Sequence, residues 1–203
     1  MKAGVFLVML FLVLSACAHI AQKDGPLLSA KEHMRLASIY EAGGEYEAAL
    51  TQYGYAAKAD PLDGEVHFVA GNVNLRLKRF KEAEAHYKKA IALNPGDARS
   101  YNNLAWSYIG SNNLEEARGA VMEALEIGGE KRHAYLDTLA VIDMKEKDFS
   151  KAESHLVEAA DMAREKEDVE GLRSIYNHLL QLYRSTGRED KAARVEEKLK
   201  SIF

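Results

Sequence analysis

The sequence predicts an all-α protein built from repeated helical hairpins. Apolar and small residues recur at helical spacing, and no stretch alternates with period two for long enough to form a strand. Two of the three prolines, Pro61 and Pro95, stand 34 residues apart. Alanines recur in register with the same spacing, which is the sequence signature of a repeat architecture.

A short apolar segment precedes the repeats. Lys2 is followed by an apolar run from Val5 to Leu14 and then by the small residues Ser15 and Ala16. A helix needs about 20 apolar residues to span a bilayer, and this run is about half as long. The three-part layout is typical of a secretory signal peptide, so we expect residues 1–16 to be removed.

Cys17 is the only cysteine in the chain and cannot form an internal disulfide. The tetrad LSAC at residues 14–17 resembles the lipobox of bacterial lipoproteins. That resemblance implies that Cys17 becomes the first mature residue and carries a covalent lipid. An ordinary signal peptide cut near Ala18 and a buried free cysteine are the alternatives. We expect residues 17–29 to form a lipidated tether, because they are few and lack a clear period.

The lipoprotein interpretation also predicts a location in the bacterial envelope. Ala18 follows the cysteine, where aspartate often marks retention in the inner membrane of Gram-negative lipoproteins. The periplasmic face of the outer membrane is therefore favoured, provided that the cell has an outer membrane.

A 34-residue frame divides the rest of the chain, residues 30–203, into five repeats. Their approximate bounds are 30–63, 64–97, 98–132, 133–172 and 173–203. One position in the second half of every repeat is alanine, namely Ala49, Ala83, Ala117, Ala152 and Ala192. Two antiparallel helices pack about 8–10 Å apart where the contacting side chains are small, so each repeat is predicted to be a helical hairpin.

Helix stops and turn residues mark the ends of the predicted helices. Asp60-Pro61 and Asn94-Pro95 end two of the second helices, because the residue before proline is disfavoured in a helix. Turn residues fall between the two helices of three repeats, at Gly43-Gly44, Gly110-Ser111-Asn112 and Gly187. The insertion at residues 161–170 is predicted to lengthen a helix before the last hairpin.

The segment RFKEAEAHYKKAIALNP at residues 79–95 resembles the second helix of the tetratricopeptide repeat, and the likeness extends from about residue 30 to the C-terminus. The fourth repeat departs at Asp143, where the family often has tyrosine. The fifth has Glu189 and Glu196 at apolar positions, as expected of a terminal unit. The resemblance implies a right-handed α-solenoid whose concave groove, lined mainly by first helices, binds an extended peptide or a partner's helix.

Helical spacing assigns thirteen side chains to this groove. They are Met34, Ser38, Phe68, Asn72, Leu75, Asn102, Asn103, Trp106, Ile109, Asp137, Val141, Asn177 and Gln181. Trp106 is the first candidate for partner binding, because tryptophan combines a large apolar area with a polar N–H. Core packing between repeats is the alternative for Trp106.

The groove asparagines have two interpretations as well. Asn72, Asn102 and Asn103 can donate to and accept from a peptide backbone, or they can belong to a solvated face with local capping. A subset of the family clamps a C-terminal carboxylate, and Asn72 matches one clamp position. Met34, Ser38, Asn102 and Trp106 occupy the others, so binding of chaperone tails is not predicted.

Other function classes find little support in the composition. Removing the signal leaves 26 basic and 31 acidic residues, a formal charge of 26 − 31 = −5, which does not suggest a nucleic-acid binder. No two of the seven histidines have helical zinc-motif spacing, and phosphate loops and nucleophile elbows are absent. We therefore predict no enzyme, no metal, no cofactor besides the lipid, and no small-molecule substrate.

Two functions remain. The chain is predicted to be a membrane-anchored adaptor for a protein of the cell envelope, or a structural or self-associating scaffold. A lipobox followed by about five such repeats is similar in architecture to lipoproteins of type IV pilus biogenesis (pilotins). Lipoprotein adaptors for peptidoglycan enzymes or proteases share that plan, so pilus or secretin biogenesis is one candidate process.

Overall fold

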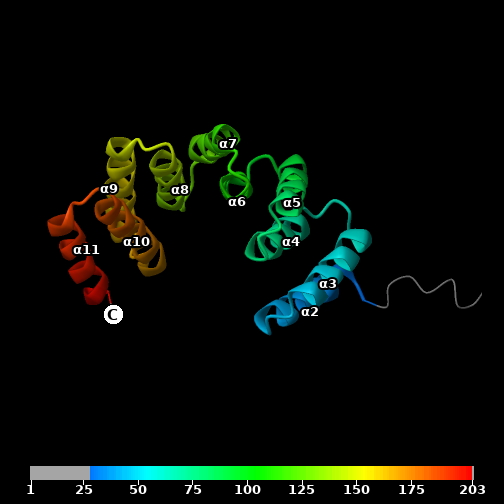
Figure 1. Ribbon diagram of the computed structural model, residues 1–203. Coiled ribbons are helices and arrows are strands. Elements are labelled where there is room, and N and C mark those ends of the chain that lie inside the picture. The colour runs from blue at the N-terminus through cyan, green and yellow to red at the C-terminus, as the bar shows by residue number, and fades with distance from the viewer. Residues whose placement is uncertain (1–27, 203) are drawn as a thin grey trace, which may run out of the picture. The chain divides into compact units, whose positions relative to one another are not determined.

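The computed structural model describes residues 28–202, and all regular structure in this range is helical (Figure 1). Cys17, the predicted signal peptide and almost all of the tether lie outside the described residues. The helices of the described part are α2 (Ala30–Ala42), α3 (Tyr46–Ala59), α4 (Gly64–Arg76), α5 (Phe80–Leu93), α6 (Ala98–Gly110), α7 (Leu114–Ile127), α8 (Arg132–Lys145), α9 (Phe149–Glu165), α10 (Val169–Ser185) and α11 (Glu189–Ser201). They pair in chain order as five hairpins, so the predicted fold class is confirmed.

The first three predicted repeats begin at the first residues of α2, α4 and α6. The fourth and fifth repeats, predicted to begin near residues 133 and 173, correspond to α8, which starts at Arg132, and α10, which starts at Val169. The insertion at residues 161–170 lengthens both neighbouring helices, because α9 runs to Glu165 and α10 starts only four residues later.

The chain divides into two compact units, one ending at Pro61 and one beginning at Leu62. The described part of unit 1 is the α2–α3 hairpin. Ser29 caps α2 with a capping box, in which its backbone N–H donates to Glu32 at 2.7 Å and its hydroxyl accepts from the Glu32 N–H. Ala37, Ala49 and Ala56 are fully buried between the two helices.

Unit 2 holds the other four hairpins around one continuous core that extends from Phe68 on α4 to Val195 on α11. The recurrent alanines are buried in all five described hairpins. Ala49, Ala83, Ala117 and Ala152 are fully buried, and Ala192 is 2% exposed. Small residues at these positions let the two helices approach, as the sequence predicted.

Every hairpin turn has the same backbone geometry. The residue in the left-handed region is Gly44, Lys78, Asn112, Lys147 or Gly187, with φ between 57° and 77°. The next residue donates its N–H to a carbonyl five positions back at 2.8–2.9 Å, which is the Schellman motif. The sequence indicated glycine or asparagine at three of these turns. Lysine occupies the other two, where composition gave no turn signal.

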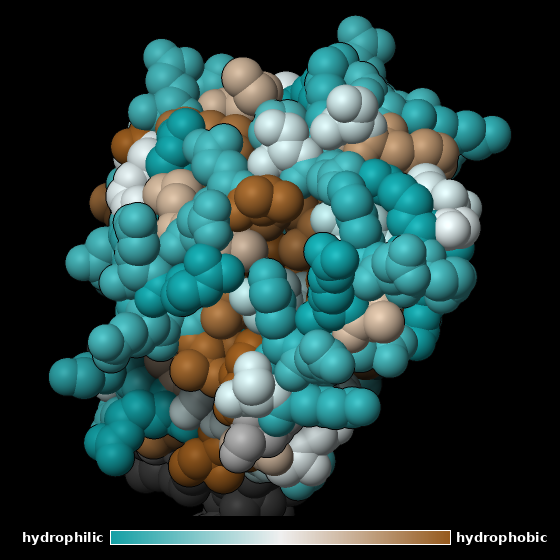
Figure 2. All heavy atoms as spheres, turned by 90° about the vertical axis from the view of Figure 1, so that its left-hand side faces the viewer, coloured by the Kyte–Doolittle hydropathy of each residue, from teal (hydrophilic) through white to brown (hydrophobic). Residues whose placement is uncertain are grey.

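The last hairpin closes the core with a polar outer surface. In α11 only Ala192 and Val195 are buried, and most of its other residues are charged. Figure 2 views unit 2 from the side where α9, α10 and α11 lie, and hydrophilic side chains cover most of that face with apolar patches between them. Such a polar face is typical of a repeat against which no other repeat packs.

Candidate protein-binding surfaces

The first helices of unit 2 form one layer. Helix α4 contacts α6, α6 contacts α8, and α8 contacts α10, whereas the second helices α5, α7 and α9 make no comparable contacts with one another in the described chain. The layer of first helices is therefore more tightly packed than the layer of second helices. A stack of hairpins with this difference curves toward its first helices, as expected of a solenoid.

A ring contact identifies the side toward which the layer curves. Trp106 on α6 stacks against His178 on α10, with the ring centroids 6.4 Å apart, although α8 lies between these helices in the chain. Side chains two repeats apart can meet only on the concave side of the layer. We use the term inner face for the surface of α4, α6, α8 and α10 that carries Trp106 and His178.

A row of three hydrogen-bonded amide side chains, which we call the amide ladder, connects α4 to α6 and consists of Asn72, Asn103 and Asn102. Asn103 donates to Asn72 Oδ1 at 2.8 Å, and the Tyr87 hydroxyl donates to the same oxygen at 2.8 Å. Asn102 donates to Asn103 Oδ1 at 3.3 Å, while its own Oδ1 is buried and has no hydrogen-bond partner among the described residues. A buried unpaired acceptor costs about 1–3 kcal/mol, so the ladder retains unused hydrogen-bonding capacity.

Asp137 lies beside His178 in a second polar cluster. It accepts from His178 Nδ1 at 2.7 Å and from the Ser174 hydroxyl at 3.1 Å, both on α10. The aspartate thus fixes the orientation of the imidazole on which the indole stacks. Its remaining exposure is 6%, so the carboxylate serves contacts within the layer rather than a ligand.

The other predicted inner-face residues differ in how much surface they offer. Phe68, Asn102, Ile109 and Asp137 are buried. The Arg99 guanidinium lies over the Phe68 ring at 4.4 Å, and the ring also packs in the core near Tyr87. The half-buried ones are Asn72, Leu75, Asn103, Trp106 and Val141, and the exposed ones are Asn177 and Gln181. Met34 and Ser38 belong to unit 1, where Met34 is half-buried and Ser38 is exposed.

Sequence analysis missed the residues that cover the inner face. Arg99 lies 31 residues after Phe68, and Ser174 and His178 lie 37 and 41 residues after Asp137. These partners come from the next first helix along the layer. Comparing each groove position with the positions of the first helix in the next repeat would have identified them.

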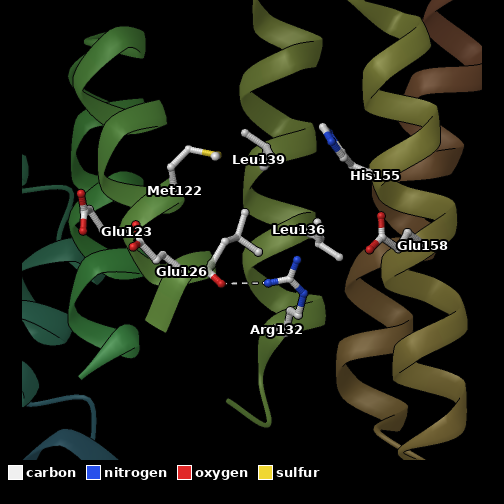
Figure 3. A pocket seen from close by; sticks show the side chains of 9 residues that line it. Met122, Glu123, Glu126, Arg132, Leu136, Leu139, His155 and Glu158 are labelled. Carbon is white, nitrogen blue, oxygen red and sulfur yellow. Dashed lines mark hydrogen bonds between the residues drawn. The ribbon is translucent and has the colours of Figure 1, made fainter. Parts of the chain in front are cut away.

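A second surface lies among α7, α8 and α9 (Figure 3). It is an open cleft of about 470 Å³. Leu136 and Leu139 of α8 lie between Met122 of α7 and His155 of α9 in the close-up view. Glu123, Glu126, Arg132 and Glu158 also line it. The sequence pattern did not predict this cleft, because its residues come from three helices.

The described residues contain no group of three or more histidine, cysteine, aspartate or glutamate side chains placed to hold a metal ion. None of the helices between residues 28 and 202 is long and apolar enough to cross a membrane.

Two family models described as tetratricopeptide repeat match the chain, one over residues 34–98 and one over residues 74–142. The chain carries tetratricopeptide repeats. Stress-induced-phosphoprotein 1 of Caenorhabditis elegans is 37% identical over 65 residues, which are 32% of this chain and 20% of that protein. Tetratricopeptide repeat-containing protein trd-1 of the same organism is 25% identical over 152 residues, which are 75% of this chain and 20% of that protein. This chain thus spans one fifth of the length of either relative.

Solved structures with the same repeats include TTC0263, a thermophilic protein of Thermus thermophilus. It is 25% identical and has a TM-score of 0.71, covering 84% of this chain and 90% of that one. The pilF protein of Pseudomonas aeruginosa is 19% identical with a TM-score of 0.59, covering 86% and 91%. The first tetratricopeptide repeat domain of Spaghetti (RPAP3), solved with the HSP90 peptide SRMEEVD, is 24% identical with a TM-score of 0.55, covering 58% and 92%. The last two likenesses concern the fold alone, and the repeats indicate a protein–protein interaction adaptor.

Proposed function

We propose that the protein is a lipid-anchored adaptor that holds a protein partner of the bacterial envelope on the inner face of its tetratricopeptide repeats. The observation that carries this proposal is the half-buried Trp106, which lies three residues after Asn103 of the amide ladder on α6. Large aromatic side chains surrounded by polar groups are frequent hot spots of protein interfaces.

The ligand is an extended or helical polypeptide segment with at least one large apolar side chain. That side chain packs against Trp106, while backbone groups of the segment bond the amides of Asn177 and Gln181, which are exposed on α10. A C-terminal carboxylate is not required, because Asn102 and Trp106 occupy positions where a carboxylate clamp has other residues. The HSP90 peptide bound to the Spaghetti domain is therefore not the expected ligand here.

Site-specific photocrosslinking in native envelopes tests this surface. A photoreactive amino acid at Gln181 on α10 is expected to capture a discrete partner, and the same amino acid at Glu197 on α11 provides the matched control. Trp106→Ala is expected to reduce capture from position 181 by about tenfold, the size of a hot-spot loss, with helical content unchanged. Equal capture from both positions, or capture that ignores Trp106→Ala, would refute an inner-face ligand.

The membrane anchor is proposed from the sequence pattern at residues 14–17, which resembles a lipobox. One acyl chain gives marginal binding and several chains give stable anchoring, at about 0.8 kcal/mol per buried methylene group. Radiolabelled palmitate should enter the wild-type protein and not Cys17→Ala, which should also leave the membrane fraction. Equal labelling of the two proteins would exclude the anchor at this residue.

Type IV pilus or secretin biogenesis is the candidate process within this proposal. Its support is the plan of a lipobox followed by tetratricopeptide repeats, together with a fold likeness to pilF at 19% identity. Deleting the gene in its own host should lower the amount of secretin multimer in the outer membrane. Unchanged multimers would direct the search to another envelope assembly.

A structural or self-associating scaffold is the alternative function. It is favoured by the contacts that already occupy the inner face, namely Trp106 on His178 and Arg99 over Phe68. A scaffold of this type should form dimers or larger assemblies in sedimentation experiments, and Gln181→Arg should disrupt them. A monomer at all concentrations would exclude self-association.

A further inference from the structure

A second binding surface, separate from the inner face, is the cleft among α7, α8 and α9, which we call the outer cleft. We propose that this outer cleft docks a polypeptide segment that combines an apolar side chain with lysine or arginine. The proposal concerns a different set of residues from the inner face and does not depend on it.

Side chains on three helices hold the walls of the cleft together. Arg118 on α7 donates to Asp143 on α8 at 2.6 Å, and His155 Nδ1 on α9 lies 2.7 Å from the other oxygen of the same carboxylate. Asp143 is fully buried. Arg132 on α8 also donates to the Leu125 carbonyl on α7 at 2.8 Å. The cleft is therefore preformed, which lowers the entropic cost of binding.

The apolar part of the cleft can accept one large side chain. Leu136 and Leu139 lie on α8 between the two walls, and Met122 is 53% exposed on the α7 wall (Figure 3). Methionine is flexible and polarizable, so it adapts to side chains of different shape and is frequent at peptide-binding surfaces. The volume of about 470 Å³ lies within the usual range of binding pockets.

The charge of the cleft determines the kind of partner. Glu123 and Glu126 on α7 and Glu158 on α9 line it, and within residues 28–202 none of the three forms an ion pair or a side-chain hydrogen bond. Arg132 is the one cationic side chain in this lining, and it is engaged with the Leu125 carbonyl. Two negative charges therefore remain in excess.

Charge complementarity selects a basic segment over other occupants. Nucleic acid and the surface of an anionic membrane are negatively charged and would be repelled by the three glutamates. A lysine or arginine beside an apolar residue satisfies both parts of the cleft, because its charged end can reach the carboxylates while its neighbour packs against Met122.

Fluorescence anisotropy with two labelled peptides tests the proposal on the full chain. One peptide carries leucines and lysines along one helical face, and the other carries glutamate in place of every lysine. The first is expected to bind saturably and the second is not. Replacing the cleft carboxylates in Glu123→Gln/Glu126→Gln/Glu158→Gln is expected to weaken binding about tenfold or more, and Met122→Ser about threefold, because both charge and apolar contact contribute.

A matched triple variant separates local contacts from general attraction. Glu115→Gln/Glu165→Gln/Glu197→Gln changes the net charge by the same amount at exposed positions outside the cleft. This control should bind the lysine peptide as the wild type does. If the two triple variants weaken binding equally, the attraction is non-specific and the proposal is wrong.

Two further outcomes would also overturn it. Absence of binding by the wild-type protein would mean that the cleft is unsuitable or already filled by the chain itself. A dimer in sedimentation experiments that dissociates in Met122→Ser would assign the cleft to a second copy. Tenfold weakening restricted to the cleft variants supports the docking site.

Discussion

Gly71→Ala in α4 provides the sharpest test of how the hairpins pack. A Cβ atom at this position would lie 2.6 Å from Cε1 of Tyr87 and 2.9 Å from its Cδ1 and Cζ. Tyr87 is fully buried on α5, and its hydroxyl donates to Asn72 Oδ1 at 2.8 Å. The ring cannot move away without disturbing both the core and the amide ladder.

The magnitude follows from two opposing effects. Alanine is favoured over glycine within a helix by about 1 kcal/mol, which stabilises the variant. Overpacking of a filled core costs about 1–3 kcal/mol, and weakening the Tyr87 hydrogen bond costs about 1 kcal/mol more. The free energy of unfolding of unit 2 is therefore expected to fall by about 1–3 kcal/mol.

Urea unfolding followed by circular dichroism measures this change, and Gly119→Ala is the control. Gly119 lies inside α7, and an added Cβ would meet no atom within 4 Å. The same chemical change should therefore stabilise the protein there, by up to about 1 kcal/mol. If Gly71→Ala stabilised the protein as much as Gly119→Ala, the inference that α4 packs closely against the Tyr87 ring would be contradicted.

Two further predictions concern acid stability. Burial, followed by the nearby charges of Lys89 and His86, lowers the pKa of His67 from 6.5 to about 4. The contribution of His67 to stability is therefore fully present above pH 6.5 and is lost as the pH falls toward 4. His86→Gln copies the His33–Gln52 pair of the first hairpin, 2.8 Å apart, and should make that loss shallower in unfolding curves taken across this range; an unchanged slope would contradict it. The hydrogen bond from Lys131, followed by that from the Gly171 N–H, lowers the pKa of Asp168 from 3.8 to about 2, so its contribution is present above pH 3.8 and is lost as the pH falls toward 2. Asp168→Asn should remove this dependence of stability on pH and, allowing for screening by solvent, lower the free energy of unfolding at neutral pH by about 1 kcal/mol. The same loss of stability between pH 3.8 and 2 as in the wild type would contradict this prediction.

The repeat architecture was predictable because its causes are local and periodic. The five mid-helix alanines and the Asp60-Pro61 and Asn94-Pro95 stops each act within one hairpin, and each recurs. The Lys78 and Lys147 turns were missed for the opposite reason. Their left-handed backbone comes from the Schellman hydrogen bonds of the turn, and lysine does not indicate it.

The inner face was less predictable because contacts between repeats determine it. Helical spacing assigned Asp137 to the groove, but only the next first helix shows that Ser174 and His178 use its carboxylate. Asp143 looked like a departure from the family pattern. In the structure its buried carboxylate accepts from Arg118 on α7 and contacts His155 on α9. Comparison with the family's tyrosine at this position does not reveal that role.

The contacts that shape unit 2 also limit what its inner face can bind. Asp137 and His178 connect neighbouring first helices, and Trp106 spans two repeats, so these side chains help to set the curvature of the layer. A partner that displaced them would have to replace those contacts, whereas one that packs against the open part of Trp106 would not. The outer cleft is held by Arg118, Asp143 and His155, none of which belongs to the inner-face network. Occupation of one surface therefore leaves the contacts of the other intact, and an adaptor with both could hold two polypeptides at once.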